Sequence, residues 1–149
     1  MFEGNYFFYL TIVIIVGGLG SYFTSVGLKS KKYLSSKKPS WYPPGYVFGI
    51  MWTIIYLLYS YSWTQASYYP VINNLFSVNM ILNALWCFFF FYTENWIIAL
   101  ITLLGLCGIL ILQMNIFYKY NTLATLLLIP YLVWSLFATF LNITLIAMN

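Results

Sequence analysis

The stretch KPSWYPPGYVFGIMWTIIY, Lys38 to Tyr56, changes within a few residues from charged and proline-rich to continuously apolar. Pro43 and Pro44 lack backbone donors, and proline suits the first turn of a helix, where those donors have no helical partner. The apolar run continues to about Gln65, which is long enough to cross a bilayer at roughly 20 residues per crossing. The stretch therefore predicts a helix that begins sharply at a membrane surface and keeps its lysines in water.

The composition extends this interpretation to the whole chain. Of its 149 residues 63% are hydrophobic, 23% are aromatic and only 5% are charged, which is far outside the range of soluble domains. We expect an all-α integral membrane protein, folded as a single five-transmembrane-helix bundle over residues 1–149. The expected helices are residues 6–28, 43–65, 75–92, 96–118 and 122–148, with 29–42 as the long loop. Pro130 predicts a kink in the last helix.

The lysines predict the orientation of the bundle. Lysine-rich short loops normally stay in the cytosol, and the loop 29–42 holds five of the six lysines: Lys29, Lys31, Lys32, Lys37 and Lys38. Five crossings then place this loop and the C-terminus in the cytosol. Such clustering excludes an extended nucleic-acid-binding face, so the expected partner is the lipid bilayer. A bacterial inner membrane, a mitochondrial outer membrane and another organelle membrane remain equally compatible.

The ionisable residues exclude several classes of membrane protein. The chain has no His, Arg or Asp, while Glu94 falls in a predicted turn and Lys119 at a predicted helix end. Pumps and proton-coupled transporters rely on ionisable groups inside their spans. Cys87 and Cys107 lie in apolar runs, which favours burial over a disulfide or a metal site. We expect neither a cofactor nor a metal site.

Three predicted helices each combine large aromatic residues with a small residue or an amide on one face. These faces are Gly49, Trp52, Tyr56, Tyr59 and Trp63; Asn79, Asn83, Trp86 and Phe90; and Trp134, Ala138 and Asn142. Together they could enclose a flat hydrophobic ligand and offer it a few hydrogen bonds. They could equally be packing surface and interfacial aromatic belt, with Asn83 and Asn142 bonding between helices. Periodicity alone leaves both interpretations open.

Three blocks of sequence resemble the TspO/translocator protein family, also known as tryptophan-rich sensory proteins or peripheral benzodiazepine receptors. They are KPSWYPPGYVFGIMWT (Lys38 to Thr53, with Tyr56), LNALWCFFF (Leu82 to Phe90) and PYLVWSLFATFLN (Pro130 to Asn142), in the family's order. The chain departs from the family pattern at Lys32 and Tyr46, where tryptophans are usual, and at Ile50, where proline is usual. These departures fall where the family's loop closes over its ligand, so they concern ligand preference.

The resemblance implies a pocket inside a five-helix bundle, with the loop 29–42 as its lid. It implies a receptor or translocator-like protein that binds porphyrins such as protoporphyrin IX and haem, sterols and benzodiazepine-type ligands, with a role in tetrapyrrole transport or regulation. The expected ligand-binding residues are Trp41, Phe48, Trp52, Asn83, Trp86, Trp134, Ala138 and Asn142.

Two other functions stay open beside ligand binding. Some bacterial members of the family degrade protoporphyrin IX in light, and Trp52 and Trp134 resemble the tryptophans assigned to that reaction. No other catalytic residue is predicted, because no acid/base or metal constellation is visible. The chain could also be a structural membrane protein without a ligand. Family members commonly dimerise, so a homodimer also stays open.

Overall fold

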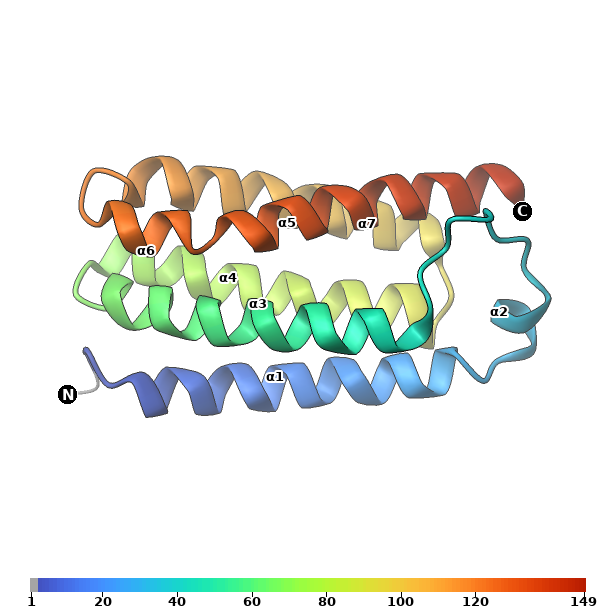
Figure 1. The fold of residues 1–149 in the computed structure, drawn as a ribbon, viewed down its shortest axis with the longest axis horizontal. Helices are drawn as coiled ribbons and strands as arrows, with labels where there is room; N and C mark the ends of the chain where they lie inside the picture. Colours follow the sequence, from blue (N-terminus) through green and yellow to red (C-terminus); the bar gives the residue numbers. More distant parts are fainter. Residues whose placement is uncertain (1–2) are drawn as a thin grey trace.

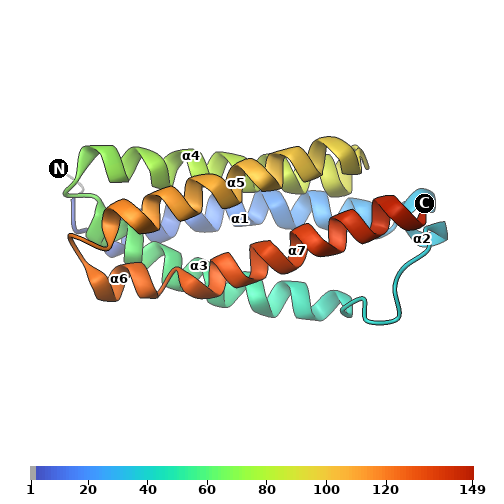
Figure 2. The same cartoon turned by 90° about the horizontal axis from the view of Figure 1, so that it is seen from above.

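The computed structural model describes residues 3–149, which form helices and no strand. The helices are α1 (Tyr6–Gly27), α2 (Lys31–Ser35), α3 (Gly45–Ala66), α4 (Pro70–Cys87), α5 (Trp96–Phe117), α6 (Thr122–Leu126) and α7 (Ile129–Met148), and a π-helical turn, η1 (Phe88–Tyr92), continues α4. The long helices lie side by side as an up-and-down bundle (Figures 1 and 2). The short helix α2 and the C-terminus lie at the end opposite to the N-terminus (Figure 1).

The helices begin where the sequence supplies partners for their first backbone N–H groups. Asn5, Asn95 and Asn121 precede α1, α5 and α6, and each side chain accepts a backbone N–H of the first turn at 2.9–3.2 Å. Helix α3 has no such side-chain cap. Its start depends instead on Pro43 and Pro44, which precede Gly45 and need no donor partner.

The helix boundaries differ from the sequence expectation mainly in α4 and near Pro130, while α3 begins at Gly45, two residues after the expected residue 43. Helix α4 begins at Pro70, five residues before the expected residue 75, because a proline fits the first helical turn and the following asparagines continue the helix. At the other end of α4 the last turn widens, with the N–H of Thr93 bonding to the carbonyl of Phe88 at 2.9 Å. The last expected helix, 122–148 with a kink at Pro130, is instead divided into two, since α6 ends at Leu126 and α7 begins at Ile129, with Pro130 in its first turn.

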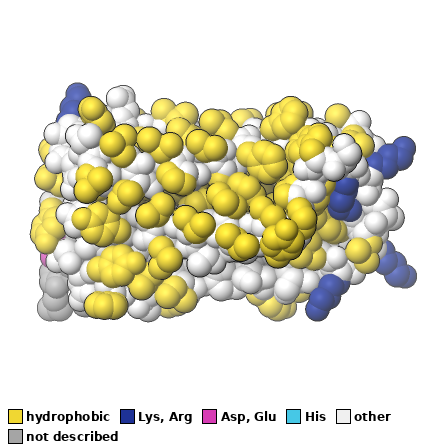
Figure 3. All heavy atoms as spheres, in the orientation of Figure 1, with side chains coloured by type: hydrophobic (Ala, Val, Ile, Leu, Met, Phe, Trp, Pro, Cys, Tyr) yellow, Lys and Arg dark blue, Asp and Glu magenta, His cyan; other side chains and the backbone are white. Residues whose placement is uncertain are grey.

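Four helical segments within the described residues are long and apolar enough to cross a membrane: Tyr6–Gly27, Pro70–Tyr92, Trp96–Phe117 and Thr122–Met148. Helix α3 is as long as α1 but has fewer aliphatic and phenylalanine side chains and contains Trp52, Trp63 and Gln65, which lowers its mean hydropathy. Large apolar side chains cover the long sides of the molecule, while lysines gather at the end that holds α2 (Figure 3). This distribution is typical of a multi-pass membrane protein.

Candidate ligand-binding site

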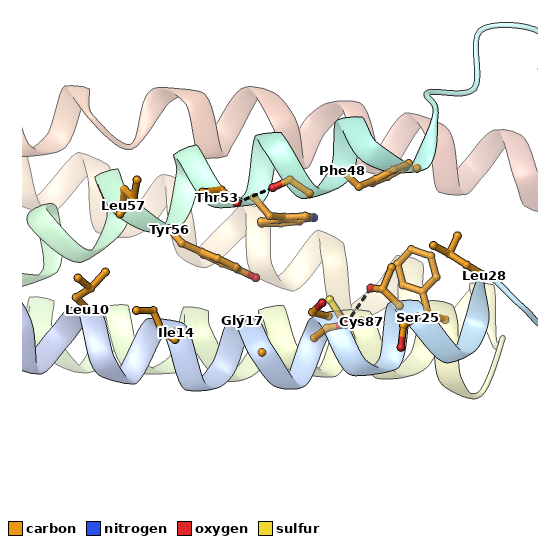
Figure 4. A pocket seen from close by; sticks show the side chains of 18 residues that line it. Leu10, Ile14, Gly17, Ser25, Leu28, Phe48, Thr53, Tyr56, Leu57 and Cys87 are labelled. Atoms are coloured by element: carbon orange, nitrogen blue, oxygen red, sulfur yellow. Dashed lines mark hydrogen bonds between the residues drawn. The ribbon is translucent and has the colours of Figure 1, made fainter.

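A cavity of about 650 Å³ lies between α1 and α3, and residues of α4 and η1 close its inner side (Figure 4). Its main lining residues are Gly17, Gly18, Gly20, Ser21 and Thr24 of α1, Phe48, Gly49, Trp52, Thr53 and Tyr56 of α3, and Cys87 and Phe91. Leu10 and Ile14 face Leu57 across one end of the cavity, and Leu28 borders the other end, near the loop (Figure 4). The cavity is therefore a half-open groove between two helices, lined mainly by apolar groups.

The wall formed by α1 has few large side chains at its centre, where Gly17, Gly18 and Gly20 lie beside Ser21 and Thr24. A Cβ atom on Gly17 would lie 2.6 Å from the ring of Tyr56, and one on Gly20 would lie 3.1 Å from Sγ of Cys87. The hydroxyl of Thr24 donates to the carbonyl of Gly20 in its own helix at 2.9 Å, so it adds little free polarity to this wall. Gly17 therefore packs closely against Tyr56, whereas a Cβ atom on Gly18 would meet no neighbour, so the space beside α1 is open at Gly18.

The wall formed by α3 is aromatic. The rings of Trp52 and Tyr56 stack with their centroids 5.4 Å apart and their planes at 27°. On the protein side, the centroid of the Trp52 ring lies 6.0 Å from that of Trp86 and 5.9 Å from that of Tyr131, with the Trp52 and Tyr131 rings in a T-shaped arrangement. Because these contacts hold the indole from the protein side, its surface is preorganised for stacking against a ligand.

A chain of buried hydrogen bonds holds the hydroxyl of Tyr56. This hydroxyl donates to Oδ1 of Asn83 at 2.8 Å, and Nδ2 of Asn83 donates to the hydroxyl of Tyr131 at 3.2 Å. The Tyr131 hydroxyl donates in turn to Oδ1 of Asn79 at 2.7 Å, and Nδ2 of Asn79 reaches the carbonyl of Leu106 at 3.4 Å. Asn83 thus links α3 to α7, and its connection to the cavity runs through Tyr56.

The predicted residues of α7 lie behind the cavity or away from it. Trp134 is buried, with its ring 5.7 Å from that of Phe48 and 5.3 Å from that of Phe137. The side-chain amide of Asn142 lies against the backbone of α5; in the orientation that satisfies both of its ends, its nitrogen donates to the carbonyl of Trp96 at 3.0 Å and its oxygen accepts the N–H of Leu100 at 3.2 Å. Asn142 therefore joins α7 to α5 by hydrogen bonds between helices.

The eight residues predicted from the sequence fall into three groups. Phe48 and Trp52 line the cavity. Three others contact a lining residue from behind: Asn83 through Tyr56, Trp86 through Trp52 and Trp134 through Phe48. Trp41, Ala138 and Asn142 are not among the residues that border it. The sequence interpretation did not include the α1 wall, whose one visible signal was the cluster of Gly17, Gly18 and Gly20.

The loop 29–42 covers the lysine-bearing end of the bundle. The hydroxyls of Tyr33 and Tyr42 are hydrogen-bonded to each other, and the ring of Tyr42 lies 6.0 Å from that of Phe48. The N–H and carbonyl of Lys37 pair with the side-chain amide of Asn149 at 2.8 and 3.0 Å. The ring of Trp41 stacks on that of Phe140, on the outer face of α7, with the ring centroids 5.2 Å apart. The loop therefore closes the end of the bundle beside Phe48.

Two ionisable side chains of the loop have shifted pKa values. Burial raises the pKa of Tyr33, an effect that its hydrogen bond with Tyr42 partly offsets. Burial lowers the pKa of Lys38, whose ammonium group lies 4.2 Å from the centre of the Tyr33 ring. Desolvation of both groups is consistent with a loop that packs on the bundle rather than extending into water.

Comparison with known proteins gives the family. Residues 8–148 match the TspO/MBR family. The chain is 32% identical over 142 residues, 92% of each chain, to the tryptophan-rich protein TspO of Archaeoglobus fulgidus. It is 36% identical to the uncharacterized membrane protein YtaB of Bacillus subtilis, over an alignment that covers 78% of this chain and 79% of the relative. It is 32% identical to the human translocator protein, over an alignment that covers 74% of this chain and 70% of the relative. The chain therefore belongs to the TspO/MBR family of membrane proteins.

Proposed function

We propose that this protein binds flat, largely apolar ligands inside the membrane, with tetrapyrroles such as protoporphyrin IX and haem as the leading class and sterols and benzodiazepine-type molecules as further ones. The observation that carries the proposal is the cavity of about 650 Å³ between the aromatic wall of α3 and the glycine wall of α1. Its volume lies within the roughly 300–1,000 Å³ typical of small-molecule sites. The name of the human relative, translocator protein, supports a role in ligand movement.

The chemistry of the two walls favours a planar ring system. Trp52 offers an aromatic face for stacking, and Gly18, where a Cβ atom would meet no neighbour, leaves room on the opposite side. Leu28 at the loop end of the cavity is followed directly by Lys29. A tetrapyrrole could thus place its macrocycle between the helices and direct its carboxylates toward the lysine-rich end, where opposite charges attract.

Helix α3 serves in this proposal as a fifth membrane crossing. Its polar residues Ser60, Ser62 and Thr64 are buried, and their hydroxyls donate to carbonyls of Tyr56, Ala124 and Ser60 at 2.7–2.8 Å. Polar groups that are hydrogen-bonded inside the bundle add little to the cost of placing a helix in lipid. With five crossings, the loop 29–42 and the C-terminus lie on the same side, and the lysines favour the cytosol.

The test compares two leucine substitutions at open glycines. Gly49 lines the cavity and a Cβ atom there would meet no neighbour, so Gly49→Leu adds a side chain to the ligand space without a clash at its first carbon. Gly105 of α5 is equally open but does not line the cavity, which makes Gly105→Leu the matched control. Affinity is measured by absorbance titration of protoporphyrin IX, haem and a sterol analogue against the purified protein.

We expect Gly49→Leu to weaken tetrapyrrole binding at least tenfold, roughly 1.4 kcal/mol, and Gly105→Leu to leave it unchanged. Equal affinity of both variants and the unsubstituted protein would contradict the location of the site. Absence of saturable binding for every ligand in the panel would contradict the function itself and favour a structural membrane protein.

A further inference from the structure

A second cleft, of about 530 Å³, lies at the lysine-bearing end of the bundle. It is bordered by Lys32 of α2, by Glu94 in the turn before α5, by Trp96 and Ile97 at the start of α5, and by Ile146 and Asn149 at the end of the chain. Figures 1 and 2 show α2 and the C-terminus at the same end of the bundle. None of these residues lines the cavity between α1 and α3. The cleft is therefore a separate site.

The cleft holds a cation and an anion that are bonded to other groups and not to each other. Nζ of Lys32 donates to the backbone carbonyl of Glu94 at 2.6 Å and lies 5.0 Å from the centre of the Trp96 ring. The carboxylate of Glu94 accepts the hydroxyl of Ser30. A carboxylate has about four acceptor positions and an ammonium group three donors, so each group retains hydrogen-bonding capacity for a ligand.

The backbone places Glu94 in this position. Its φ of 52° lies in the left-handed region, which residues other than glycine rarely adopt. The N–H of Asn95 bonds to the carbonyl of Phe89 at 2.9 Å, and the side chain of Asn95 caps α5. The π-helical turn and the cap together hold the acidic side chain beside α2.

The apolar side of the cleft continues onto the surface that faces lipid. Ile97 is 63% exposed at the beginning of α5, and Ile146 lies near the end of α7. Both helices belong to segments that are apolar enough to span a membrane. A molecule with its polar part at Lys32 and Glu94 could therefore lay an acyl chain along α5 and α7. The cleft lies at the boundary where lipid headgroups are found.

We propose that this cleft binds the headgroup of a phospholipid that carries both a phosphate and a primary amine, as phosphatidylethanolamine does. The phosphate accepts hydrogen bonds from Lys32, and the ammonium group donates to the carboxylate of Glu94. A headgroup with only negative charge would face Glu94 unfavourably. A quaternary amine has no N–H to donate to this carboxylate.

Native mass spectrometry of the purified full-length protein tests this proposal. The protein is titrated with phosphatidylethanolamine, phosphatidylcholine and phosphatidylglycerol of identical acyl chains, and with soluble glycerophosphoethanolamine. The variants are Lys32→Gln and Glu94→Gln. Lys31→Gln is the matched control, because Lys31 is the neighbouring exposed lysine of α2 and does not border the cleft.

We expect phosphatidylethanolamine to bind roughly tenfold more tightly than the other two lipids. Glu94→Gln should remove this preference. Lys32→Gln should weaken the binding of all three lipids, because each carries the phosphate, and Lys31→Gln should change neither the preference nor the affinities. Equal binding of the three lipids, or a preference that survives in Glu94→Gln, would overturn the proposal. Glycerophosphoethanolamine binding as tightly as the lipid would overturn the lipid assignment. Protoporphyrin IX titrations and thermal unfolding should be unchanged in the variants. The first result would show that the lipid effect does not arise at the cavity between α1 and α3, and the second that it does not arise from misfolding.

Discussion

Trp52 and Trp134 occupy different positions relative to the cavity, so their substitution should have different effects on ligand binding. Trp52 lines the cavity, whereas Trp134 lies behind Phe48, with the two rings 5.7 Å apart. Trp52→Phe keeps an aromatic ring but removes the larger indole face. Aromatic pairs contribute about 0.5–1.5 kcal/mol beyond area burial, which corresponds to a loss of roughly two- to tenfold in affinity. Trp134→Phe should leave affinity within about twofold.

The assay is the absorbance change of protoporphyrin IX on titration with each purified variant. Tryptophan fluorescence is unsuitable, because each substitution removes part of the reporter. Thermal unfolding of both variants checks that the bundle is intact. The reasoning is refuted if Trp134→Phe weakens binding as much as Trp52→Phe or more. That result would mean that the ligand lies deeper, between α3 and α7.

Three further predictions concern the surroundings of the cavity. Asn83→Leu removes the hydrogen-bond partner of two tyrosine hydroxyls. At about 0.6 kcal/mol for each hydrogen bond inside a membrane bundle, it should lower the free energy of unfolding by about 1 kcal/mol. Equal stability of the variant in a detergent titration would contradict the role of Asn83 in linking α3 to α7. Gly27→Ala would place a Cβ against the backbone carbonyl of Phe91 and should cost about 1–3 kcal/mol, so an unchanged unfolding midpoint would disprove this close helix contact. Bound protoporphyrin IX should protect Cys87, which lines the cavity, from an apolar thiol reagent and leave labelling of Cys107 unaffected; equal protection of both thiols would argue against binding beside Cys87.

Much of the fold follows from local sequence signals. The prolines before Gly45 set the start of α3, and the asparagines before α1, α5 and α6 cap those helices. Pro130 predicts a disturbance of the last helix, which the structure shows as a break between α6 and α7 rather than a kink. These features depend on a few neighbouring residues, which is why they can be read from the chain before any packing is known.

The rotation of each helix about its axis does not follow from such signals. Asn142 could equally face a ligand or another helix by its periodicity, and packing places its amide against the backbone of α5. The cavity wall of α1 was missed because glycines such as Gly17 and Gly18 carry no side-chain pattern. The π-helical turn at Phe88–Tyr92 was missed for a related reason, since a run of aromatic residues specifies no particular hydrogen-bond period.

A structure of the protein with protoporphyrin IX bound in lipid would test the central claim most directly. We predict that the macrocycle lies between α1 and α3, with one face against Trp52, the other against the glycines of α1 and its carboxylates toward the lysine-bearing end. A macrocycle bound against Trp134 and Asn142, with the space between α1 and α3 left empty of ligand, would contradict the account.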